Sequence, residues 1–333
     1  MKILQIANYQ EGVGGISVQV RLLRDLLRSE GHMCDIVSTK GSFARRLKAI
    51  CSLLTKGIRY DVFHIHACSD RGFLPAVLGI SIGCLLSKRI VLTFHGGGAE
   101  SFFQRKPRLI KSFLTRTSAN IVLSGFIGHV FDQYGINYTV IPNILEVDDT
   151  AFKIRAEIHP RFICIRSLTG TYNIKCTLTA FGIVQEKYPE AKLMLLGGGP
   201  LKSELEQYVQ NNHLQNVSFI GQVPNNEVYK YLDEADIMVS SSQFDNMPVS
   251  ILEGFRAGLL VISSNVGGIP YMIEDGQNGL LFKNDDARQM AEKMIAAVED
   301  ADTTRWMIAN ARHSLDDYKW ENCREKLFSL YNG

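Results

Sequence analysis

Several features that mark membrane, secreted and nucleic-acid-binding proteins are missing from this sequence. Its most apolar stretch, residues 73–86, is shorter than the roughly 20 residues of a spanning helix and contains a proline and two glycines. The seven cysteines are scattered without C-x-x-C spacing, so neither a zinc site nor a disulfide framework is indicated. The 36 Lys and Arg residues nearly balance the 34 Asp and Glu residues, which leaves no basic field for nucleic acid. Because the chain opens in a strand-like run and not in a signal peptide, we expect a globular protein of the reducing cytoplasm.

Short aliphatic and β-branched runs alternate with helical patterns along the whole chain. In the first half we expect strands at residues 3–7, 33–38, 62–66, 90–94, 121–124 and 138–141. In the second half we expect them at residues 162–166, 192–196, 217–220, 237–240, 260–262 and 280–282. Strands that alternate with helices form parallel sheets covered on both faces. The predicted fold class is therefore α/β, with two Rossmann-like doubly wound domains.

The periodic pattern lapses between residues 142 and 160, where the chain becomes polar and acidic and carries two prolines. We therefore predict a first domain at residues 1–145, a linker at 146–160, a second domain at 161–315 and a terminal helix at 316–333. No strand follows this terminal helix, so it cannot connect two strands of the second sheet as a crossover. We expect it to pack on another part of the protein. In the first domain, a single helix is expected over about residues 101–117.

Glycine runs follow two predicted strands of the first domain, and the loops after parallel strands are where ligands bind. The loop ending in Gly14 and Gly15 matches neither the nicotinamide fingerprint nor the P-loop, which leaves an anion-binding turn and a plain turn as equal alternatives. His95 precedes three glycines that would let a ligand approach the backbone, so we interpret it as lining a site. His64 and His66 share one face of a strand without a third ligand nearby, which favours core or cleft-edge histidines over a metal pair.

In the second domain, cations and glycines collect at the same predicted sheet edge. Gly198 and Gly199 join a strand to a helix, and the free amides of such a loop suit a phosphate. Arg166 ends the preceding strand and Lys175 begins the next helix, so both are candidate partners of a diphosphate. The alternative for each cation is a solvated surface charge.

The most distinctive segment follows the strand at residues 237–240. Asp245 stands on a loop and Glu253 stands early in the helix that follows, so both carboxylates can border one cleft. A Gly-Gly-Ile-Pro loop at residues 267–270 and an Asp-Gly-x-x-Gly-Leu-Leu hairpin at residues 275–281 come next. In this order and spacing, these motifs resemble the donor domain of retaining glycosyltransferases of family 4, which have the GT-B fold. The Gly14 loop, His95, the Val-Ile-Pro-Asn run at 140–143 and the terminal helix resemble the rest of such a chain.

The resemblance implies an acceptor-binding first domain and a second domain that binds a nucleoside-diphosphate sugar, with the active site in the cleft that they face. The terminal helix would cross back to the first domain. Glu253 would accept hydrogen bonds from the ribose, Asp245 would lie beside the transferred sugar, and Arg166 would neutralise the leaving diphosphate. His95 would approach an outer sugar hydroxyl. The remaining donor-binding residues would be Gly14, Gly15, Lys175, Gly198, Gly199, Asn246, Met247, Pro248, Val249 and Ser250.

Two residues depart from the family pattern. Asp245 replaces the usual glutamate, which shortens the side chain by one methylene. Lys175 lies farther from Arg166 than the family's lysine, with residues 169–173 inserted between them. These departures bear on sugar choice and on the phosphate role of Lys175.

The implied reaction is transfer of a hexosyl or N-acetylhexosaminyl group with retention, in the assembly of a cell-surface polysaccharide or glycolipid. A UDP-sugar is favoured over a GDP-sugar, and no cofactor or metal is expected, because protein cations and amides can meet the diphosphate charge. The one D-x-D, at residues 300–302, falls in a polar segment that we interpret as solvated surface. Two alternatives are a sugar-nucleotide epimerase and a degenerate sugar-nucleotide-binding subunit.

Four cations of the first domain, Arg105, Lys106, Arg108 and Lys111, alternate with large apolar residues just after His95. Such a patch predicts weak, salt-sensitive docking on the inner face of the cytoplasmic membrane, with a lipid-linked or glycan acceptor. The alternative is a solvated helix face with ordinary core positions.

Overall fold

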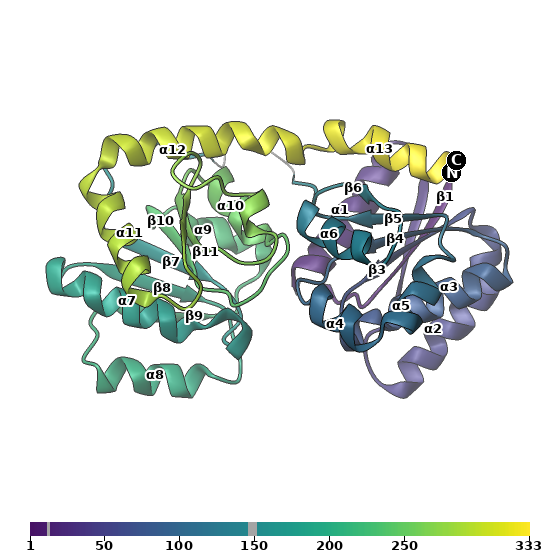
Figure 1. Ribbon diagram of the computed structural model, residues 1–333, viewed down its shortest axis with the longest axis horizontal. Helices are drawn as coiled ribbons and strands as arrows, with labels where there is room; N and C mark the ends of the chain where they lie inside the picture. The colour runs from purple at the N-terminus through teal and green to yellow at the C-terminus, as the bar shows by residue number, and fades with distance from the viewer. Residues whose placement is uncertain (12–13, 146–151) are drawn as a thin grey trace. The chain divides into compact units, whose positions relative to one another are not determined.

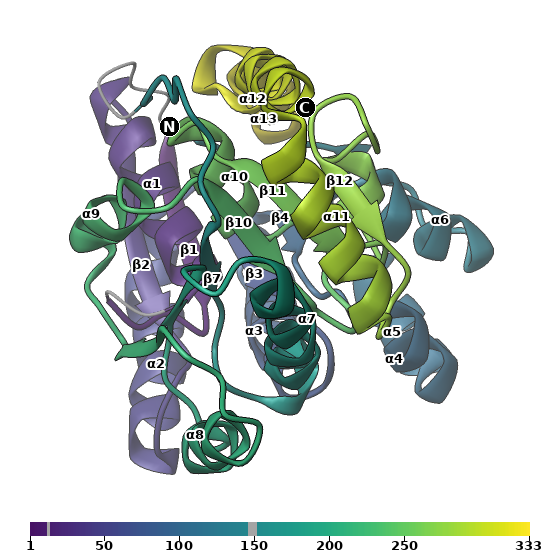
Figure 2. The same ribbon diagram turned by 90° about the vertical axis from the view of Figure 1, so that its left-hand side faces the viewer.

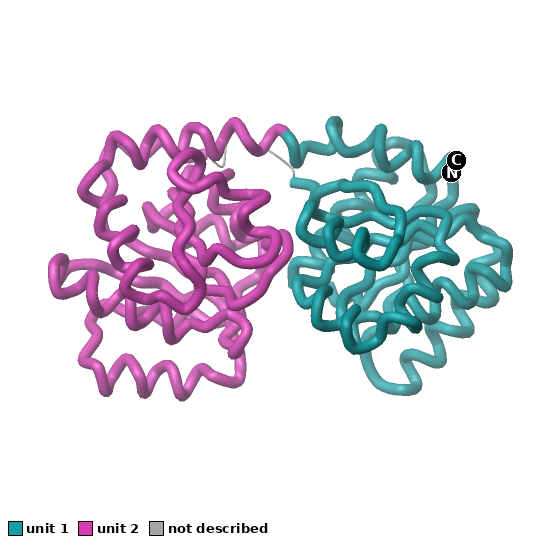
Figure 3. The backbone as a smooth tube through the Cα atoms, viewed as in Figure 1, with its two compact units in different colours: residues 1–146, 317–333 teal, residues 147–316 magenta. Residues whose placement is uncertain are grey.

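A computed structural model of the chain describes residues 1–11, 14–145 and 152–333. It divides into two compact units, one of residues 1–146 with 317–333 and one of residues 147–316 (Figure 3). Each unit contains a six-stranded parallel sheet with flanking helices, so the predicted α/β fold class is confirmed. Figure 1 labels most of the helices and strands, and Figure 2 adds the labels of β2 and β12. None of the described helices is long and apolar enough to cross a membrane.

Unit 1 contains a sheet in the order β2-β1-β3-β4-β5-β6. Its strands are β1 (Lys2–Ala7), β2 (Met33–Ser38), β3 (Val62–Ala67), β4 (Arg89–Phe94), β5 (Ala119–Val122) and β6 (Thr139–Val140). Its helices are α1 (Gly15–Ser29), α2 (Phe43–Lys56), α3 (Leu74–Leu85), α4 (Ala99–Arg105), α5 (Pro107–Leu114), α6 (Gly125–Gln133) and, from the end of the chain, α13 (Trp320–Asn332). Chain order reverses between β1 and β3, which is where open parallel sheets bind ligands.

The two faces of the unit 1 sheet have different cores. Helices α2 to α6 pack on the face that carries Ile6, Ile65 and Phe94, which are fully buried. Helices α1 and α13 cover the opposite face, where Ile3 and Val91 pack against apolar residues of both helices. In Figure 2, α1 lies beside β1 and β2. The terminal helix is therefore part of the core of unit 1.

One helix predicted in unit 1 is two. Instead of a single helix over residues 101–117, α4 ends at Arg105 and α5 begins at Pro107. Lys106 between them has φ −138° and ψ 49°, because the ring of a following proline disfavours helical backbone in the residue before it.

Unit 2 contains a sheet in the order β12-β11-β10-β7-β8-β9. Its strands are β7 (Arg161–Ile165), β8 (Lys192–Leu196), β9 (Val217–Gly221), β10 (Ile237–Ser240), β11 (Leu260–Ser264) and β12 (Leu280–Phe282). Its helices are α7 (Ile174–Lys187), α8 (Lys202–Asn211), α9 (Val228–Leu232), α10 (Val249–Arg256), α11 (Ala287–Glu299) and α12 (Ala301–Ser314). The strand order is that of a dinucleotide-binding sheet, and its reversal point lies between β7 and β10.

The predicted linker lies partly inside unit 2. Residues 146–151 fall outside the described residues, but Arg155 is buried and donates hydrogen bonds to the backbone oxygens of Leu232, Ala235, Ala257 and Gly258. It also forms an ion pair of 3.3 Å with the buried carboxylate of Asp236. Arg155 and Ile158 therefore anchor this segment in unit 2, and the polarity that suggested a linker comes partly from the buried cation.

We predict that Arg155→Ala destabilises unit 2 strongly. Removing one partner of a buried pair leaves carbonyls and a carboxylate short of donors, which costs about 3 kcal/mol. For a domain of this size that lowers Tm by roughly 6–12 °C. The matched control is Arg288→Ala, because Arg288 is exposed and forms its ion pair with the exposed Glu292 on α11. Thermal unfolding followed by circular dichroism measures both variants, and equal Tm values for them would contradict the prediction.

Candidate functional site

The reversal point of the unit 2 sheet gathers the residues expected to bind the donor. Arg166 follows β7 directly, and the loop with Asp245 and Asn246 follows β10. The glycine loop at residues 197–199 follows the neighbouring strand β8, and helix α10, which carries Glu253, begins after the β10 loop. Because the strands are parallel, all these loops leave the sheet at the same edge.

Arg166 is held at this edge by contacts from several loops. Its Nε donates to Ser240 Oγ at 3.2 Å and its Nη1 donates to Ser250 Oγ at 2.7 Å. The guanidinium lies over the Tyr172 ring, 5.4 Å from the ring centroid, and its Nη2 is 3.6 Å from Asp245 Oδ2. Nη2 is buried and makes no hydrogen bond within the described residues. The fixed cation therefore keeps one N–H group without a hydrogen-bond acceptor, next to the carboxylate of Asp245.

The backbone of Asp245 and Asn246 packs directly against the Gly-Gly-Ile-Pro loop at residues 267–270. A Cβ at Gly267 would stand 2.0 Å from Asp245 O, and one at Gly268 would stand 2.1 Å from Asn246 O. The Gly268 N–H donates to Asp245 O at 3.0 Å. Only glycine permits such close contact between the two backbones. The loop after β11 therefore helps to fix the conformation of the loop that carries Asp245 and Asn246.

Glu253 stands in the second turn of α10, whose first turn contains Ser250. Its side chain is half-buried and forms no hydrogen bond within the described part of the chain. Burial raises the pKa of this carboxyl, while the positive charges of Arg166 and Arg256 oppose the rise. An acceptor kept near a cation and without internal donors suits a ligand that supplies hydroxyl groups.

The glycine loop after β8 packs tightly against the loop after β7. A Cβ at Gly197 would stand 2.1 Å from Arg166 O, and one at Gly199 would stand 2.2 Å from Leu168 O. The Leu168 N–H donates to Gly198 O at 3.0 Å. Among the described residues, the amides of Gly198 and Gly199 donate to no acceptor, which leaves them available to a phosphate.

The structure does not join Lys175 to this group. Its amine lies over the Tyr208 ring of α8, 5.4 Å from the centroid. Residues 170–172, inside the predicted insertion, form a 3-10 turn that places Tyr172 over Arg166. The insertion thus gives Arg166 an aromatic neighbour, and Lys175 contacts neither Arg166 nor the glycine loop within the described residues.

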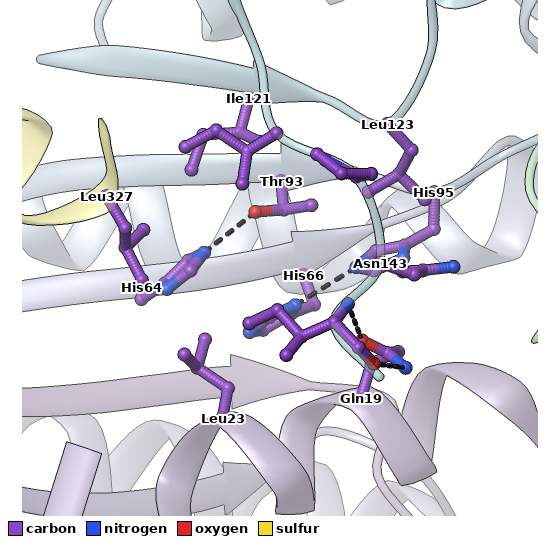
Figure 4. Close-up of a pocket in the computed structure, with 13 residues that line it drawn as sticks. Gln19, Leu23, His64, His66, Thr93, His95, Ile121, Leu123, Asn143 and Leu327 are labelled. Carbon is purple, nitrogen blue, oxygen red and sulfur yellow. Dashed lines mark hydrogen bonds between the residues drawn. The ribbon is translucent and has the colours of Figure 1, made fainter. Parts of the chain in front are cut away.

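Unit 1 holds the other candidates, in a group of its own. His64, His66 and His95 line a cavity of about 40 Å³ (Figure 4). His64 Nδ1 and Nε2 contact Tyr331 OH and Thr93 Oγ1, at 2.6 and 2.8 Å, so these side chains are satisfied core groups as expected. Among the described residues, no three His, Cys, Asp or Glu side chains, these histidines included, are placed so that they could hold a metal ion.

The glycine turn of unit 1 is described in part, because residues 12 and 13 lie outside the described ranges. Gly14 precedes α1 with φ +80°, a conformation that favours glycine, and Gly15 is the first residue of the helix. No side chain caps this helix start among the described residues. The observed turn fits an anion-binding turn and a plain strand-to-helix turn equally well, so the structure does not choose between these two alternatives.

The basic segment after His95 differs from the expectation. Phe102, Phe103 and Ile110 are buried in the core of unit 1, so they are not interleaved with cations on the surface. Arg105 forms an ion pair of 2.7 Å with Asp70. Lys106, Arg108 and Lys111 are exposed. The buried apolar residues agree with the alternative of a helix face with ordinary core positions, and membrane docking by the four cations stays a prediction.

Residues 148–314, half of the chain, match the family described as "Glycosyl transferases group 1". The chain belongs to this family, and the predicted enzyme class, glycosyltransferase, is confirmed. The finer expectations of retention, donor and acceptor go beyond this match.

Relatives that cover most of the chain are also named as glycosyltransferases. The uncharacterised glycosyltransferase MJ1178 of Methanocaldococcus jannaschii is 22% identical, covering 97% of this chain and 95% of its own. The putative colanic acid biosynthesis glycosyltransferase WcaL of Escherichia coli is 25% identical, covering 85% of this chain and 73% of its own. The crystal structure of Anabaena HepE in complex with UDP and glucose has a TM-score of 0.80 at 18% identity, with 100% of both chains covered. The GT-B fold expected from the sequence is thereby confirmed.

Two residues around Arg166 were missed from the sequence. Ser240 is the last residue of a predicted strand and begins a run of three serines, and Tyr172 lies in the apparent insertion at residues 169–173. A hydroxyl at the end of a strand next to a predicted site is a usable signal for the first. Nothing in the sequence indicates that Tyr172 folds back over Arg166, because that depends on the turn at residues 170–172.

We predict that neighbouring glycines of the β8 loop respond differently to alanine. Gly199→Ala drives a Cβ into Leu168 O, so it lowers Tm by several degrees and weakens nucleotide binding. Gly198→Ala is the matched control, because its Cβ would meet only Gln222 Cβ at 3.9 Å and its fold stays intact. Thermal unfolding of both variants provides the comparison. A Gly199→Ala variant as stable as wild type would show that the packing of the two loops is not required.

Proposed function

We propose that this glycosyltransferase transfers a hexosyl or N-acetylhexosaminyl group from a nucleoside-diphosphate sugar, UDP-sugar favoured, to an acceptor hydroxyl with retention. The acceptor belongs to cell-surface polysaccharide or glycolipid assembly, as in the named role of WcaL. The observation that carries the proposal is that Arg166 Nη2 and, in a loop at the same sheet edge, the amides of Gly198 and Gly199 form no hydrogen bond within the described residues. The bound UDP and glucose of HepE support the choice of donor class.

The direct test is incubation with UDP-glucose and related sugar nucleotides, followed by analysis of released nucleotide and of product by NMR. A new glycoside with the anomeric configuration of the donor supports the proposal. An epimerised sugar nucleotide supports the epimerase alternative, and binding of nucleotides without any turnover supports a degenerate subunit.

Glu253 is proposed to hold the ribose hydroxyls of the donor, since its carboxylate is an acceptor without internal donors. We predict that Glu253→Gln weakens nucleotide binding roughly tenfold to a hundredfold, the value of a charge-assisted contact of about 1.5–3 kcal/mol. Because burial raises the pKa of Glu253, binding also weakens as the pH falls through that raised value. The matched control is Glu204→Gln in the exposed first turn of α8. Calorimetry measures the nucleotide affinity of wild type and both variants. Equal affinities for the three proteins would reject the ribose role of Glu253.

Arg166 and the loop amides are proposed to meet the charge of the leaving diphosphate without a metal ion. We predict that activity survives EDTA and that Arg166→Lys lowers kcat more than it raises KM, because leaving-group charge grows in the transition state. Lysine keeps the charge but has no planar fork of N–H groups, so it cannot reproduce the fixed contacts of Arg166 to Ser240 and Ser250. Loss of activity in EDTA with recovery on adding Mg²⁺ or Mn²⁺ overturns this part of the proposal.

We also propose that the enzyme works at the inner face of the cytoplasmic membrane, docked through helix α2. Between Asp35 and Asp61 the chain has no acidic residue but carries Lys40, Arg45, Arg46, Lys48, Lys56 and Arg59. On this helix and the turn after it, Phe43, Leu47, Leu54 and Ile58 are exposed by 81, 51, 37 and 63%. Exposed apolar groups among cations suit an anionic lipid surface, where each cation contributes about 1 kcal/mol. The segment at residues 105–111 lacks such apolar exposure apart from Leu109.

Two variants that each lose four positive charges test the membrane proposal. We predict that the quadruple variant of Arg45, Arg46, Lys48 and Lys56 to glutamine loses at least tenfold in co-sedimentation with anionic vesicles at low salt. The matched variant of Arg105, Lys106, Arg108 and Lys111 to glutamine keeps most of it. The reverse result assigns docking to α4 and α5. If wild type stays in the supernatant, a soluble acceptor is the better interpretation.

A further inference from the structure

Three side chains from adjacent strands of unit 1 form a buried chain of hydrogen bonds that ends at His95. Gln5 lies on β1, His66 on β3 and His95 directly after β4, next to one another at the reversal point of the sheet. Gln5 Oε1 contacts His66 Nε2 at 2.9 Å, and His66 Nδ1 contacts His95 Nε2 at 3.0 Å. Figure 4 shows the second contact as a dashed line between the two rings.

The proton positions along this chain follow from its first member. The Gln5 amide nitrogen donates to Val20 O at 3.0 Å and contacts Cys34 Sγ at 3.4 Å, so its oxygen must face His66 as an acceptor. His66 Nε2 therefore carries a proton. A neutral imidazole with Nε2–H has its lone pair on Nδ1, so His95 Nε2 must donate to it. By the same rule, His95 Nδ1 is left with a lone pair.

The surroundings keep both rings neutral. Gln5 and His66 are buried, and apolar side chains such as Leu23, Ile121 and Leu327 line the adjoining cavity. Burial lowers the pKa of His95 to about 4 and that of His66 well below its usual value. Stacking of His66 on His64, with ring centroids 4.4 Å apart, disfavours a second proton further. A charged His66 would donate at both nitrogens and would reverse the tautomer of His95.

His95 Nδ1 makes no hydrogen bond to the described residues, and the ring is half-buried beside three glycines. We propose that Gln5 and His66 are positioning residues that fix His95 as the Nε2–H tautomer and so offer its Nδ1 to a substrate hydroxyl. The proposal rests on the proposed function for the hydroxyl that binds there. A fixed lone pair accepts from a hydroxyl but repels a carboxylate or carbonyl oxygen, so the site selects a sugar with a hydroxyl at that position.

Histidine NMR of the whole protein tests the tautomer without any substrate. Long-range ¹H–¹⁵N correlations report which ring nitrogen carries the proton in each of the eight histidines, with His95 assigned from the His95→Asn variant. We expect His95 to be protonated on Nε2 in wild type and to become a mixture of tautomers in Gln5→Leu. The matched control is Tyr331→Phe, which removes a hydrogen bond to His64 in the same cavity but leaves the Gln5 chain intact. Protonation on Nδ1 in wild type, or an unchanged His95 in Gln5→Leu, overturns the proposal.

Activity with UDP-glucose tests the consequence. We expect Gln5→Leu to lower kcat/KM about tenfold while the Kd for UDP alone stays unchanged, and Tyr331→Phe to keep both. If both variants lose activity equally, the effect is one of general packing and the positioning role is overturned. A wild-type protein that turns over no sugar nucleotide refutes the proposed function instead, and the NMR result still decides the tautomer.

Discussion

Burying one guanidinium at the carboxyl end of a parallel sheet requires partners for its N–H groups, and this requirement orders the loops of unit 2. Ser240 at the end of β10 and Ser250 in the first turn of α10 bond two nitrogens of Arg166, and the Tyr172 ring covers the plane. Gly197 and Gly199 have no Cβ, so their loop packs directly on the carbonyls of Arg166 and Leu168. Gly267 and Gly268 pack in the same way on the carbonyls of Asp245 and Asn246. Within the described residues, Nη2 forms no hydrogen bond and faces the Asp245 carboxylate at 3.6 Å.

In unit 1, buried neutral polar groups likewise have hydrogen-bond partners on neighbouring elements. The sheet face beneath α1 and α13 carries a row of polar side chains, and each is satisfied by a neighbour, so burial costs little. Helix α13 closes this face: Leu327 lines the cavity and Tyr331 bonds His64. The terminal helix thus belongs to unit 1 because it covers polar groups that would otherwise stand open to water. The hydrogen bonds of this row continue from Gln5 through His66 to His95.

Periodicity was sufficient to predict each strand of the described ranges, because parallel strands that are buried on both faces have short aliphatic sequences between helices. Strand-end loops then gave Arg166, Asp245, Glu253 and His95. Contacts between distant segments could not be predicted: the fold-back of Tyr172, the burial of Arg155 in a polar stretch, and the burial of Phe102 within a basic one. In each case a side chain's environment is set by another element, and charge along the sequence does not report it. The exposed apolar residues of α2 were missed for the same reason.

The central claim is that unit 2 binds the nucleotide of the donor at the edge formed by the loops after β7, β8 and β10. Hydrogen exchange of the whole protein, measured by mass spectrometry with and without saturating UDP, tests it most directly. The claim predicts slower exchange in residues 197–201 and 246–256, where unbonded amides and the start of α10 would meet the phosphates. Unchanged exchange in those residues, or protection confined to unit 1, would contradict it.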